Sequence, residues 1–335
     1  MEIPIKNIYY ILSYAWKYFK FNDISAIDKK DFQTTTEFFG ELFDLSFTRY
    51  IKKGLQRGYI TYNEELKTIK SKIDFGTTLK KVGFKSKKFH CIYDEYTINN
   101  LTNQVIKSTA FLLIKSEIRQ EQKKSIKKKL VFLSGIESKQ ITKKTLKQLK
   151  RSRDNYNLNF LLDICSYIIL NSGFKEDRGK HFLSDFTNEN SMPAIFENFI
   201  LNFYKKNLKD FKVKGSEHIK WDSETESILY PVMKTDVTIR NSEITYIIDT
   251  KYYKDMFQYN FNTPKFRSNN IYQIFTYLNN FKESHDGLEG MLLYPSTHSK
   301  IRNERIISGK KISINTVNLN QEWNDVESEL LEIIK

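Results

Sequence analysis

The sequence is poor in the residues that interrupt regular structure and in those that build covalent or metal scaffolds. Its 335 residues include 12 glycines, 5 prolines and 2 cysteines. So few glycines and prolines favour long helices and strands over loop-rich modules. The two cysteines, Cys91 and Cys165, are far apart and lack CxxC spacing, which excludes a disulfide scaffold and a cysteine zinc site. We expect both thiols to be reduced and buried.

Two further absences exclude whole classes of protein. The longest apolar stretch, residues 160–170, is too short to span a bilayer, and the start of the chain lacks a signal-peptide pattern. We therefore expect a cytoplasmic protein without a membrane partner. No G-x-x-x-x-G-K-[ST] string occurs, because the nearest one, Gly173 to Lys180, has one residue too many and no hydroxyl after the lysine. The sequence thus excludes a P-loop NTPase.

Positive charge is what the sequence has in excess. The net charge is +14, which suits a polyanionic partner such as nucleic acid, although a lysine-rich proteome would give the same balance. Residues 115–153 hold fourteen Lys or Arg against three Glu, so this run alone carries +11 (14 − 3). It is either a solvated helical face or a surface that contacts phosphates, and the sequence leaves both open.

Apolar periodicity gives a coarse map of an α/β protein. It predicts helices at residues 4–21, 36–55, 99–116, 156–172 and 193–207. Alternating patterns predict strands at 59–63, 68–75 and 89–93. We expect an N-terminal mixed α/β region of residues 1–155, followed by a C-terminal domain of residues 156–335 with a mixed sheet flanked by helices.

The most informative segment, residues 229–251, contains two β-rich runs about Asn241-Ser242. If that dipeptide is the loop of a hairpin, paired positions sum to 483 and Asp236 lies opposite Ile247. Side chains alternate between faces, so Asp236, Asp249 and Lys251 share one face. The other face would collect four apolar side chains: Val237, Ile239, Tyr246 and Ile248. A one-residue change in loop length would break this arrangement.

Two carboxylates on neighbouring strands are what a hard divalent ion such as Mg²⁺ needs, and a nearby lysine can orient or deprotonate water. An Asp-x-Lys pair on a solvent-facing strand edge would look the same in sequence. On a helix predicted from residue 269, Gln273 and Tyr277 stand together at i,i+4 spacing. Glu197 falls off the apolar stripe of its own helix, where it either supplies a further metal oxygen or is solvated.

Taken in order, Glu197, Asp236, Asp249-Thr-Lys251 and Gln273-x-x-x-Tyr277 resemble the PD-(D/E)xK nuclease fold, and the last pair resembles the QxxxY signature of RecB-like nucleases. Over most of its length the chain is similar to the McrC family, the nuclease subunit of 5-methylcytosine-dependent McrBC restriction systems. The resembling strings are Ile3–Trp16, Arg57–Ile60, Tyr93–Tyr96 with Asn103, Phe196-Glu197, Asp249–Tyr252 and Leu292–Pro295. One departure is Thr235, since proline usually precedes the first catalytic aspartate. Residue 235 is no ligand and should point to the apolar face, so the chemistry survives.

The resemblance implies a Mg²⁺-dependent endonuclease acting on methylated DNA in antiviral defence. Asp236, Asp249 and the Thr250 carbonyl would bind the metal, Lys251 would position water, and Gln273 with Tyr277 would support the site. It also implies double-stranded DNA as substrate and a hexameric AAA+ GTPase partner, McrB-like, which binds the GTP and on which residues 1–155 dock. The resemblance also allows complexes of this chain with its partner to dimerise. Two alternatives stay open: a non-catalytic activator of an AAA+ NTPase, and a stand-alone RecB-like repair nuclease.

Overall fold

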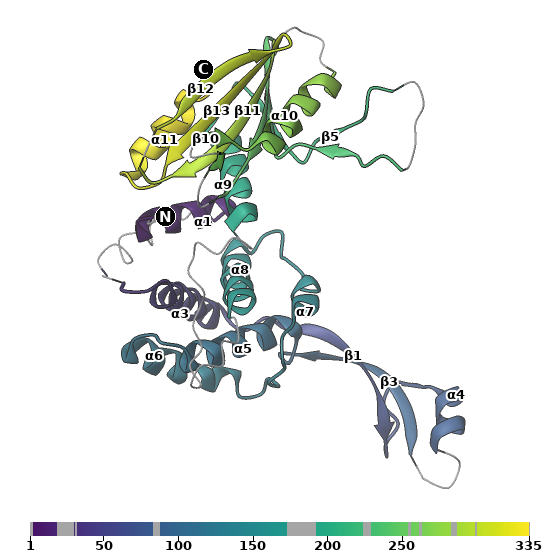
Figure 1. Ribbon diagram of the computed structural model, residues 1–335. Helices are drawn as coiled ribbons and strands as arrows, with labels where there is room; N and C mark the ends of the chain where they lie inside the picture. The colour runs from purple at the N-terminus through teal and green to yellow at the C-terminus, as the bar shows by residue number, and fades with distance from the viewer. Residues whose placement is uncertain are drawn as a thin grey trace. The chain divides into compact units, whose positions relative to one another are not determined.

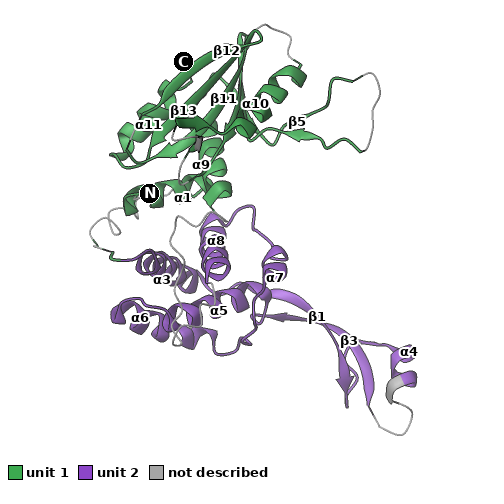
Figure 2. Cartoon of the chain, viewed as in Figure 1, with its two compact units in different colours: residues 1–33, 184–335 green, residues 34–183 purple. Residues whose placement is uncertain are grey.

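The computed structural model describes residues 3–18, 30, 32–82, 88–172, 192–223, 229–253, 256–260, 263–282, 287–298 and 300–334. The chain forms two compact units (Figure 2): residues 1–33 with 184–335 make unit 1, and residues 34–183 make unit 2. It therefore begins in unit 1, builds unit 2 and returns. The boundary expected after residue 155 matches neither edge of unit 2.

Unit 1 is built on a six-stranded mixed sheet with the strand order β12-β13-β11-β8-β7-β4 (Figure 1). β11 is parallel to both β8 and β13, and the other pairs are antiparallel. The strands are β4 (Lys212–Gly215), β7 (Val237–Arg240), β8 (Ile244–Thr250), β11 (Gly287–Ser296), β12 (Arg302–Ile307) and β13 (Lys310–Asn318). Two ribbons accompany them, β5 (His218–Ile219) with β6 (Met233–Lys234) and β9 (Phe257–Asn260) with β10 (Thr263–Phe266). The expected mixed sheet flanked by helices is confirmed.

Helix α10 (Ser268–Asn280) packs closely on one face of this sheet. Its Ile274 and Leu278 join Leu292 of β11 in a buried apolar cluster. Gly290 permits the approach, because a Cβ atom there would lie 2.8 Å from side-chain atoms of both Ile274 and Leu278. The close contact fixes α10, and the polar side chains on its flank, against the central strands.

Helix α9 (Met192–Asn207) covers the opposite face. The ring of its Phe196 lies 6.0 Å from that of Tyr252, a residue on the face away from α10. Helix α11 (Trp323–Glu332) packs beside α9, where the Tyr204 hydroxyl donates to the Leu330 carbonyl at 2.9 Å. The central strands β8 and β11 are thus buried between helices, and the face that carries Asp249 is covered by α10.

Helix α1 (Ile5–Ala15) also belongs to unit 1, although it lies at the start of the chain. The Asn7 side-chain amide donates to the Leu319 carbonyl at 2.9 Å. The Tyr10 ring stacks on Trp323 of α11 with centroids 4.3 Å apart. These contacts explain why the first residues fold with the C-terminal sheet and not with the segment that follows them in sequence.

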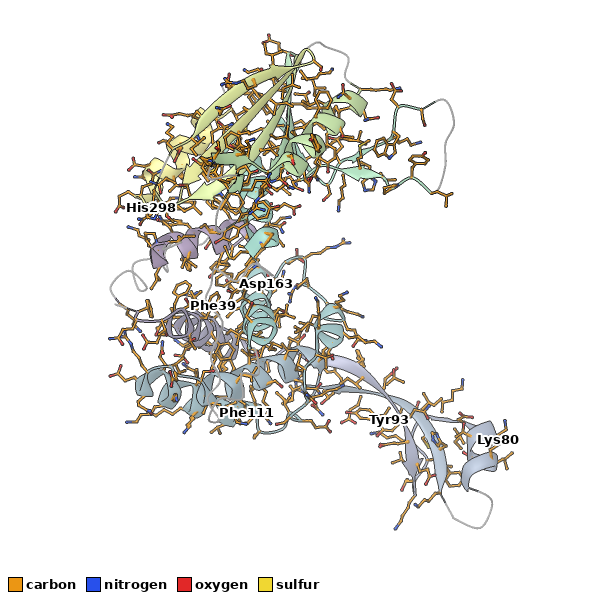
Figure 3. The ribbon with its side chains drawn as sticks, in the orientation of Figure 1. Phe39, Lys80, Tyr93, Phe111, Asp163 and His298 are labelled. Carbon is orange, nitrogen blue, oxygen red and sulfur yellow. The ribbon has the colours of Figure 1, made fainter. Side chains whose placement is uncertain are left out.

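Unit 2 combines packed helices with an antiparallel sheet of order β1-β3-β2. Its elements are α3 (Thr35–Lys53), β1 (Gly58–Leu66), β2 (Lys72–Ile73), α4 (Phe75–Thr77), the π-helical turn η2 (Thr78–Val82), β3 (Phe89–Thr97), α5 (Leu101–Lys115), α6 (Gln120–Leu130), the 3-10 turn η3 (Val131–Leu133), α7 (Lys143–Lys147) and α8 (Tyr156–Asn171). The rings of Phe39 on α3 (Figure 3) and Tyr167 on α8 stack with centroids 4.3 Å apart. Helix α8, which we expected to open the C-terminal domain, is therefore part of the unit 2 core.

Local chemistry sets the ends of these elements. Thr34 caps α3 by accepting a hydrogen bond from the Glu37 amide at 3.1 Å, and Gly54 ends the helix with a φ of +94°. The strand expected over residues 68–75 shrinks to β2, because the Asp74 carboxylate accepts from the Thr77 amide at 3.0 Å and starts α4 instead. No described helix is long and apolar enough to cross a membrane.

Part of the basic run 115–153 is used to hold unit 2 together. Ion pairs join Arg119 to Glu37 at 3.3 Å, Lys129 to Asp44 at 2.6 Å and Arg151 to Asp163 at 2.6 Å. Other lysines of the run, among them those at positions 124, 127 and 128, are exposed. The run thus combines cations that hold unit 2 together with lysines that are exposed.

Candidate active site

The β7–β8 hairpin has a different register from the expected one, because its turn lies one residue later in the sequence. Val237 pairs with Ile248 and Arg240 with Thr245, so paired positions sum to 485 and not 483. The Asn241 amide donates to the Ile244 carbonyl at 3.0 Å, which places Ser242-Glu243 at the centre of the turn. The expected pairing of Asp236 with Ile247 is wrong. Continued by one residue, the observed register sets Asp236 opposite Asp249.

The change of register keeps the predicted faces. Because each partner moves by two residues, the side chains on each face stay the same. Val237 and Ile239 share the apolar face with Ile248 and Tyr246, as expected. Asp236, Asp249 and Lys251 remain together on the other.

Asp236 is half-buried just before β7. Its Oδ2 accepts one hydrogen bond from the Thr250 amide at 2.8 Å and another from the Thr250 hydroxyl at 2.9 Å. Two donors from one residue of β8 fix the carboxylate beside the end of that strand. The sequence pointed to Thr250 only through its carbonyl, and its hydroxyl had no signal in the pattern.

Asp249 is buried, with 1% of its surface exposed, next to the Lys251 ammonium. Burial raises the pKa of the Asp249 carboxyl to about 6; Lys251 opposes this shift, and Asp236 adds to it. Burial alone would lower the pKa of Lys251, but the two aspartates more than offset it and raise the pKa above its usual value. The site therefore keeps its lysine charged and makes its central carboxylate harder to ionise.

A chain of hydrogen bonds links Lys251 to helix α10. The Lys251 ammonium donates to Gln273 Oε1 at 2.9 Å, and Gln273 Nε2 donates to the Tyr277 hydroxyl at 2.7 Å. That hydroxyl in turn donates to the Lys234 carbonyl at 2.9 Å. Gln273 thus contacts Lys251 directly, and Tyr277 is linked to Lys251 through Gln273. The last acceptor in this series of hydrogen bonds is the Lys234 carbonyl, and nothing in the sequence indicated its role.

Glu197 of α9 is half-buried near the same groups. Burial and then the charge of Asp236 raise the pKa of its carboxyl, while Lys234 and Lys251 oppose the shift. Its charge is therefore felt at the site. Even so, the described residues contain no cluster of three or more Asp, Glu, His or Cys side chains placed to hold a metal ion.

The donor set still fits a magnesium ion. Mg²⁺ is bound in proteins by one or two carboxylates and keeps several waters, so a third acidic ligand is not required. The Lys251 ammonium pairs with Asp249 Oδ2 at 2.7 Å, and both hydrogen bonds from Thr250 to Asp236 end on Oδ2. Each carboxylate has two oxygens with about four acceptor sites, so both side chains keep acceptor capacity for a cation.

The sequence did not indicate two further hydrogen bonds near the site. Thr235 donates its amide hydrogen to the Glu217 carbonyl at 3.0 Å, a bond that the proline usual at this position cannot make. The side chain of Asn270 on α10 donates to the Tyr294 hydroxyl of β11 at 2.9 Å, which adds a second tie between this helix and the sheet. The sequence contained Tyr294 only as part of a string resembling a family.

Comparisons with known proteins identify the family. A family model described as McrBC 5-methylcytosine restriction system component matches residues 6–295. The Type IV methyl-directed restriction enzyme EcoKMcrBC of Escherichia coli (strain K12) is 31% identical over 342 residues, covering 99% of this chain and 97% of that protein. A chain in the refined half-complex from the tetradecameric assembly of Thermococcus gammatolerans McrB AAA+ hexamers with bound McrC shares the fold, with a TM-score of 0.55 and 16% identity over 98% of this chain and 76% of that one. The present chain belongs to the McrBC 5-methylcytosine restriction system component family.

Proposed function

We propose that this protein is the Mg²⁺-dependent endonuclease subunit, of the PD-(D/E)xK type, of a restriction complex that cuts methylated double-stranded DNA in antiviral defence. One observation carries the proposal. Asp236 and Asp249 converge beside Lys251, and Gln273 from α10 accepts a hydrogen bond from that lysine at 2.9 Å. Membership of the family supports the substrate class.

Asp236 and Asp249, with the Thr250 carbonyl, would hold the metal. When bound, the ion polarises the scissile phosphate and acidifies a water molecule. Thr250 keeps Asp236 in place through its amide and hydroxyl. Glu197 would stay outside the ligand set and act on the site through its charge.

Lys251 would position the attacking water. An ammonium group has three N–H donors. In this structure it contacts Asp249 at 2.7 Å and donates to Gln273 at 2.9 Å, which leaves one N–H for a water or a phosphate oxygen. Gln273 and Tyr277 would hold the ammonium in that orientation and would not touch the reacting atoms.

A partner would supply nucleotide chemistry. The Thermococcus gammatolerans assembly contains McrB AAA+ hexamers with bound McrC. By analogy, this chain would act with a McrB-like hexameric GTPase that binds GTP, selects the DNA and is stimulated by the chain, and whole complexes would dimerise. Unit 2 would dock on that motor, since Tyr59 of β1 and Tyr96 of β3 are 76% and 55% exposed and their rings lie 5.0 Å apart. Exposed tyrosines are typical of contact surfaces.

The catalytic part is tested with the chain coexpressed with the AAA+ protein encoded beside it. Asp236→Ala, Asp249→Ala and Lys251→Ala should each abolish Mg²⁺-dependent cleavage of methylated DNA and leave the far-ultraviolet circular dichroism spectrum unchanged. Cleavage near the wild-type rate in any two of these variants would remove the site assignment.

The docking part needs a different change. Deleting residues 1–155 would strip α1 from unit 1, so a loss of cleavage would say nothing about docking. Replacing residues 34–183 by a flexible linker keeps α1. The linked chain should fold but neither bind the motor nor stimulate GTP hydrolysis. Full stimulation by this variant would show that unit 2 does not dock. Tyr59→Ser with Tyr96→Ser is the milder version.

The two alternatives predict other outcomes. A non-catalytic activator would stimulate GTP hydrolysis equally well with Asp249→Ala and would never cut DNA. A stand-alone repair nuclease would cut at full rate without unit 2. The paired carboxylates and the lysine between them favour the restriction nuclease over the first, and the size of unit 2 favours it over the second.

A further inference from the structure

Strands β5 and β6 form the base of an arm on unit 1. The described residues of this β5–β6 arm are 217–223 and 229–235, and Figure 1 shows β5 extending away from the six-stranded sheet. Beyond the strands, the arm exposes four large apolar side chains: Trp221 (39%), Leu229 (87%), Tyr230 (65%) and Val232 (60%). Several such side chains together on a soluble domain mark a binding surface.

The arm is held by its own contacts. At its base Ile219 pairs with Met233, and both are buried in the apolar cluster under α10. Farther out, the Trp221 indole N–H donates to the Pro231 carbonyl at 2.8 Å, and its ring meets the Tyr230 ring edge-on at 6.3 Å. The exposed side chains thus stand on a structured base.

The arm is also tied to the residues of the candidate active site. The Tyr277 hydroxyl donates to the Lys234 carbonyl at 2.9 Å, and Asp236 follows Lys234 by two residues. The Asp222 amide donates to the Asn280 side chain at the end of α10, at 2.8 Å. One helix therefore supports both the catalytic lysine, through Gln273, and the arm.

We propose that Leu229, Tyr230 and Val232 of the β5–β6 arm pack against the bases of the bound DNA duplex beside the cut, where they open a base step and hold the scissile phosphate at the acidic cluster. Apolar side chains inserted at a base step are a known way for proteins to grip and bend DNA. The inference rests on the proposed nuclease function and names the part of that site that contacts bases.

The surroundings favour DNA over a protein as the occupant. The acidic side chains of the described arm are engaged: Glu217 pairs with Arg240 at 2.5 Å, and Asp222 pairs with Lys282 at 2.8 Å. Lys220 and Lys234 are exposed on either side of the apolar group. The patch adjoins the candidate phosphodiester-cutting site through Lys234 and Tyr277, and this position suits a polyanion whose bases offer flat apolar faces.

The reach of the arm sets where the contact falls. Tyr230 precedes Asp236 by six residues (236 − 230), and an extended chain covers about 3.3 Å per residue, so the ring lies within roughly 20 Å of the acidic cluster. Base pairs are stacked at about 3.4 Å, so the opened step lies within about six steps of the cleaved bond.

The test uses the full chain in complex with its AAA+ partner, on methylated duplexes with 2-aminopurine placed in turn at each of the six steps on either side of the cut. An Asp249→Asn background keeps the DNA intact. We expect fluorescence to rise at one or two adjacent steps. The triple variant Leu229→Ser, Tyr230→Ser and Val232→Ser should remove that rise. In a protein that keeps Asp249, the same three substitutions should slow cleavage roughly tenfold or more. Ile306→Ser on the distant edge strand β12, 77% exposed, is the matched control and should change neither.

The outcomes separate the arm from the nuclease. Unchanged fluorescence at every step in a complex that binds DNA, or wild-type cleavage by the triple variant, overturns the proposal for the arm. So does loss of the AAA+ partner from the purified triple variant with DNA binding retained, because the arm would then be a protein contact. A fluorescence rise that depends on the arm, in a complex that never cuts, supports the arm and overturns the nuclease.

Discussion

Each unit sets an aspartate beside a cation, and Asp249 in unit 1 is buried whereas Asp163 in unit 2 is half-buried. Asp249 lies 2.7 Å from Lys251 in unit 1, and Asp163 lies 2.6 Å from Arg151 in unit 2. In both, burial raises the pKa of the carboxyl to about 6 against the pull of the neighbouring cation. Among the residues that the structure describes, the first pair alone has a second carboxylate, Asp236, and a chain of hydrogen bonds through Gln273 to Tyr277. A buried ion pair with a shifted pKa is therefore not in itself a site; converging oxygen ligands make it one.

The largest expected effect is the loss of DNA cleavage when Asp249 is replaced, compared with the loss when Asp163 is replaced. Asp249→Ala should reduce DNA cleavage by more than about a hundredfold, because the metal loses a ligand and Lys251 loses its partner. Asp163→Ala should leave cleavage by the folded protein within a few-fold of wild type. Single-turnover rates of the purified complexes measure both. Equal losses in the two variants would mean that buried aspartates matter here only for folding.

The pH dependence of the free energy of unfolding provides a second comparison of Asp249 with Asp163. Each folded aspartate has a pKa near 6, against about 3.9 in an unfolded chain, so the folded state holds these protons more tightly. Without metal, both pairs should therefore make the free energy of unfolding fall as pH rises from about 4 to about 6, and above that window the loss is complete. Thermal unfolding in a chelator across this range measures it, with Asp163→Asn removing one part of the slope.

Magnesium should then separate the two aspartates. At pH 7.5 the ion binds ionised Asp249 and should raise the melting temperature of the wild type and of Asp163→Asn. Asp249→Asn should show no such rise. An equal response in Asp249→Asn would place the metal elsewhere. At Mg²⁺ concentrations that do not saturate the site, cleavage should fall about tenfold per pH unit below pH 6, because protons then compete with the metal for the Asp249 carboxylate.

A smaller loss is expected one step away from the metal. Gln273→Ala removes the acceptor that orients Lys251, and groups that orient active-site residues typically contribute 10- to 100-fold. Tyr277→Phe removes only the hydroxyl and should have a weaker effect of the same kind. Phe275→Ala, which packs on the apolar cluster, is the control for stability. A melting temperature for Gln273→Ala as low as that of Phe275→Ala would make Gln273 a packing residue.

The smallest effect concerns the basic run of unit 2. If the exposed Lys124, Lys127 and Lys128 neutralise DNA phosphates, replacing them by Gln should flatten the plot of log affinity against log salt by up to about 0.9 per contact. Lys129→Gln is the contrast, because that lysine pairs with Asp44 and its loss should lower stability instead. An unchanged slope in the triple variant would leave the run as a solvated face.

Sequence predicted which residues share a face of the sheet better than it predicted how they pair. The alternation of side chains along a strand placed Asp236, Asp249 and Lys251 on one face. That placement holds although the predicted position of the hairpin loop was wrong. The turn was wrong because Asn241 uses its side-chain oxygen to accept from the Glu243 and Ile244 amides, which moves the loop by one residue. The alternative of an Asp-x-Lys pair on a solvent-facing strand edge does not hold, because Asp249 is buried and Lys251 donates to Gln273 of α10.

The division of the chain into two units could not be predicted from local sequence patterns. Composition changed near residue 155, where the basic run ends and the apolar helix α8 begins, and this suggested a boundary. The true partition depends on contacts such as Asn7 with Leu319 and Tyr10 with Trp323, which join the two ends of the sequence. No local pattern records a pairing across 312 residues.

That pairing sets an order on biosynthesis. The amide of Asn7 meets the Leu319 carbonyl across 312 residues, and ribosomes add roughly 5 to 20 residues per second, so α1 waits about 15 to 60 seconds for its partners. Unit 2, complete by residue 183, can fold on the nascent chain meanwhile. Unit 1 is then finished only when the residues of α11 have been made, and a ribosome that stalls earlier releases a fragment in which α1 lacks its partners.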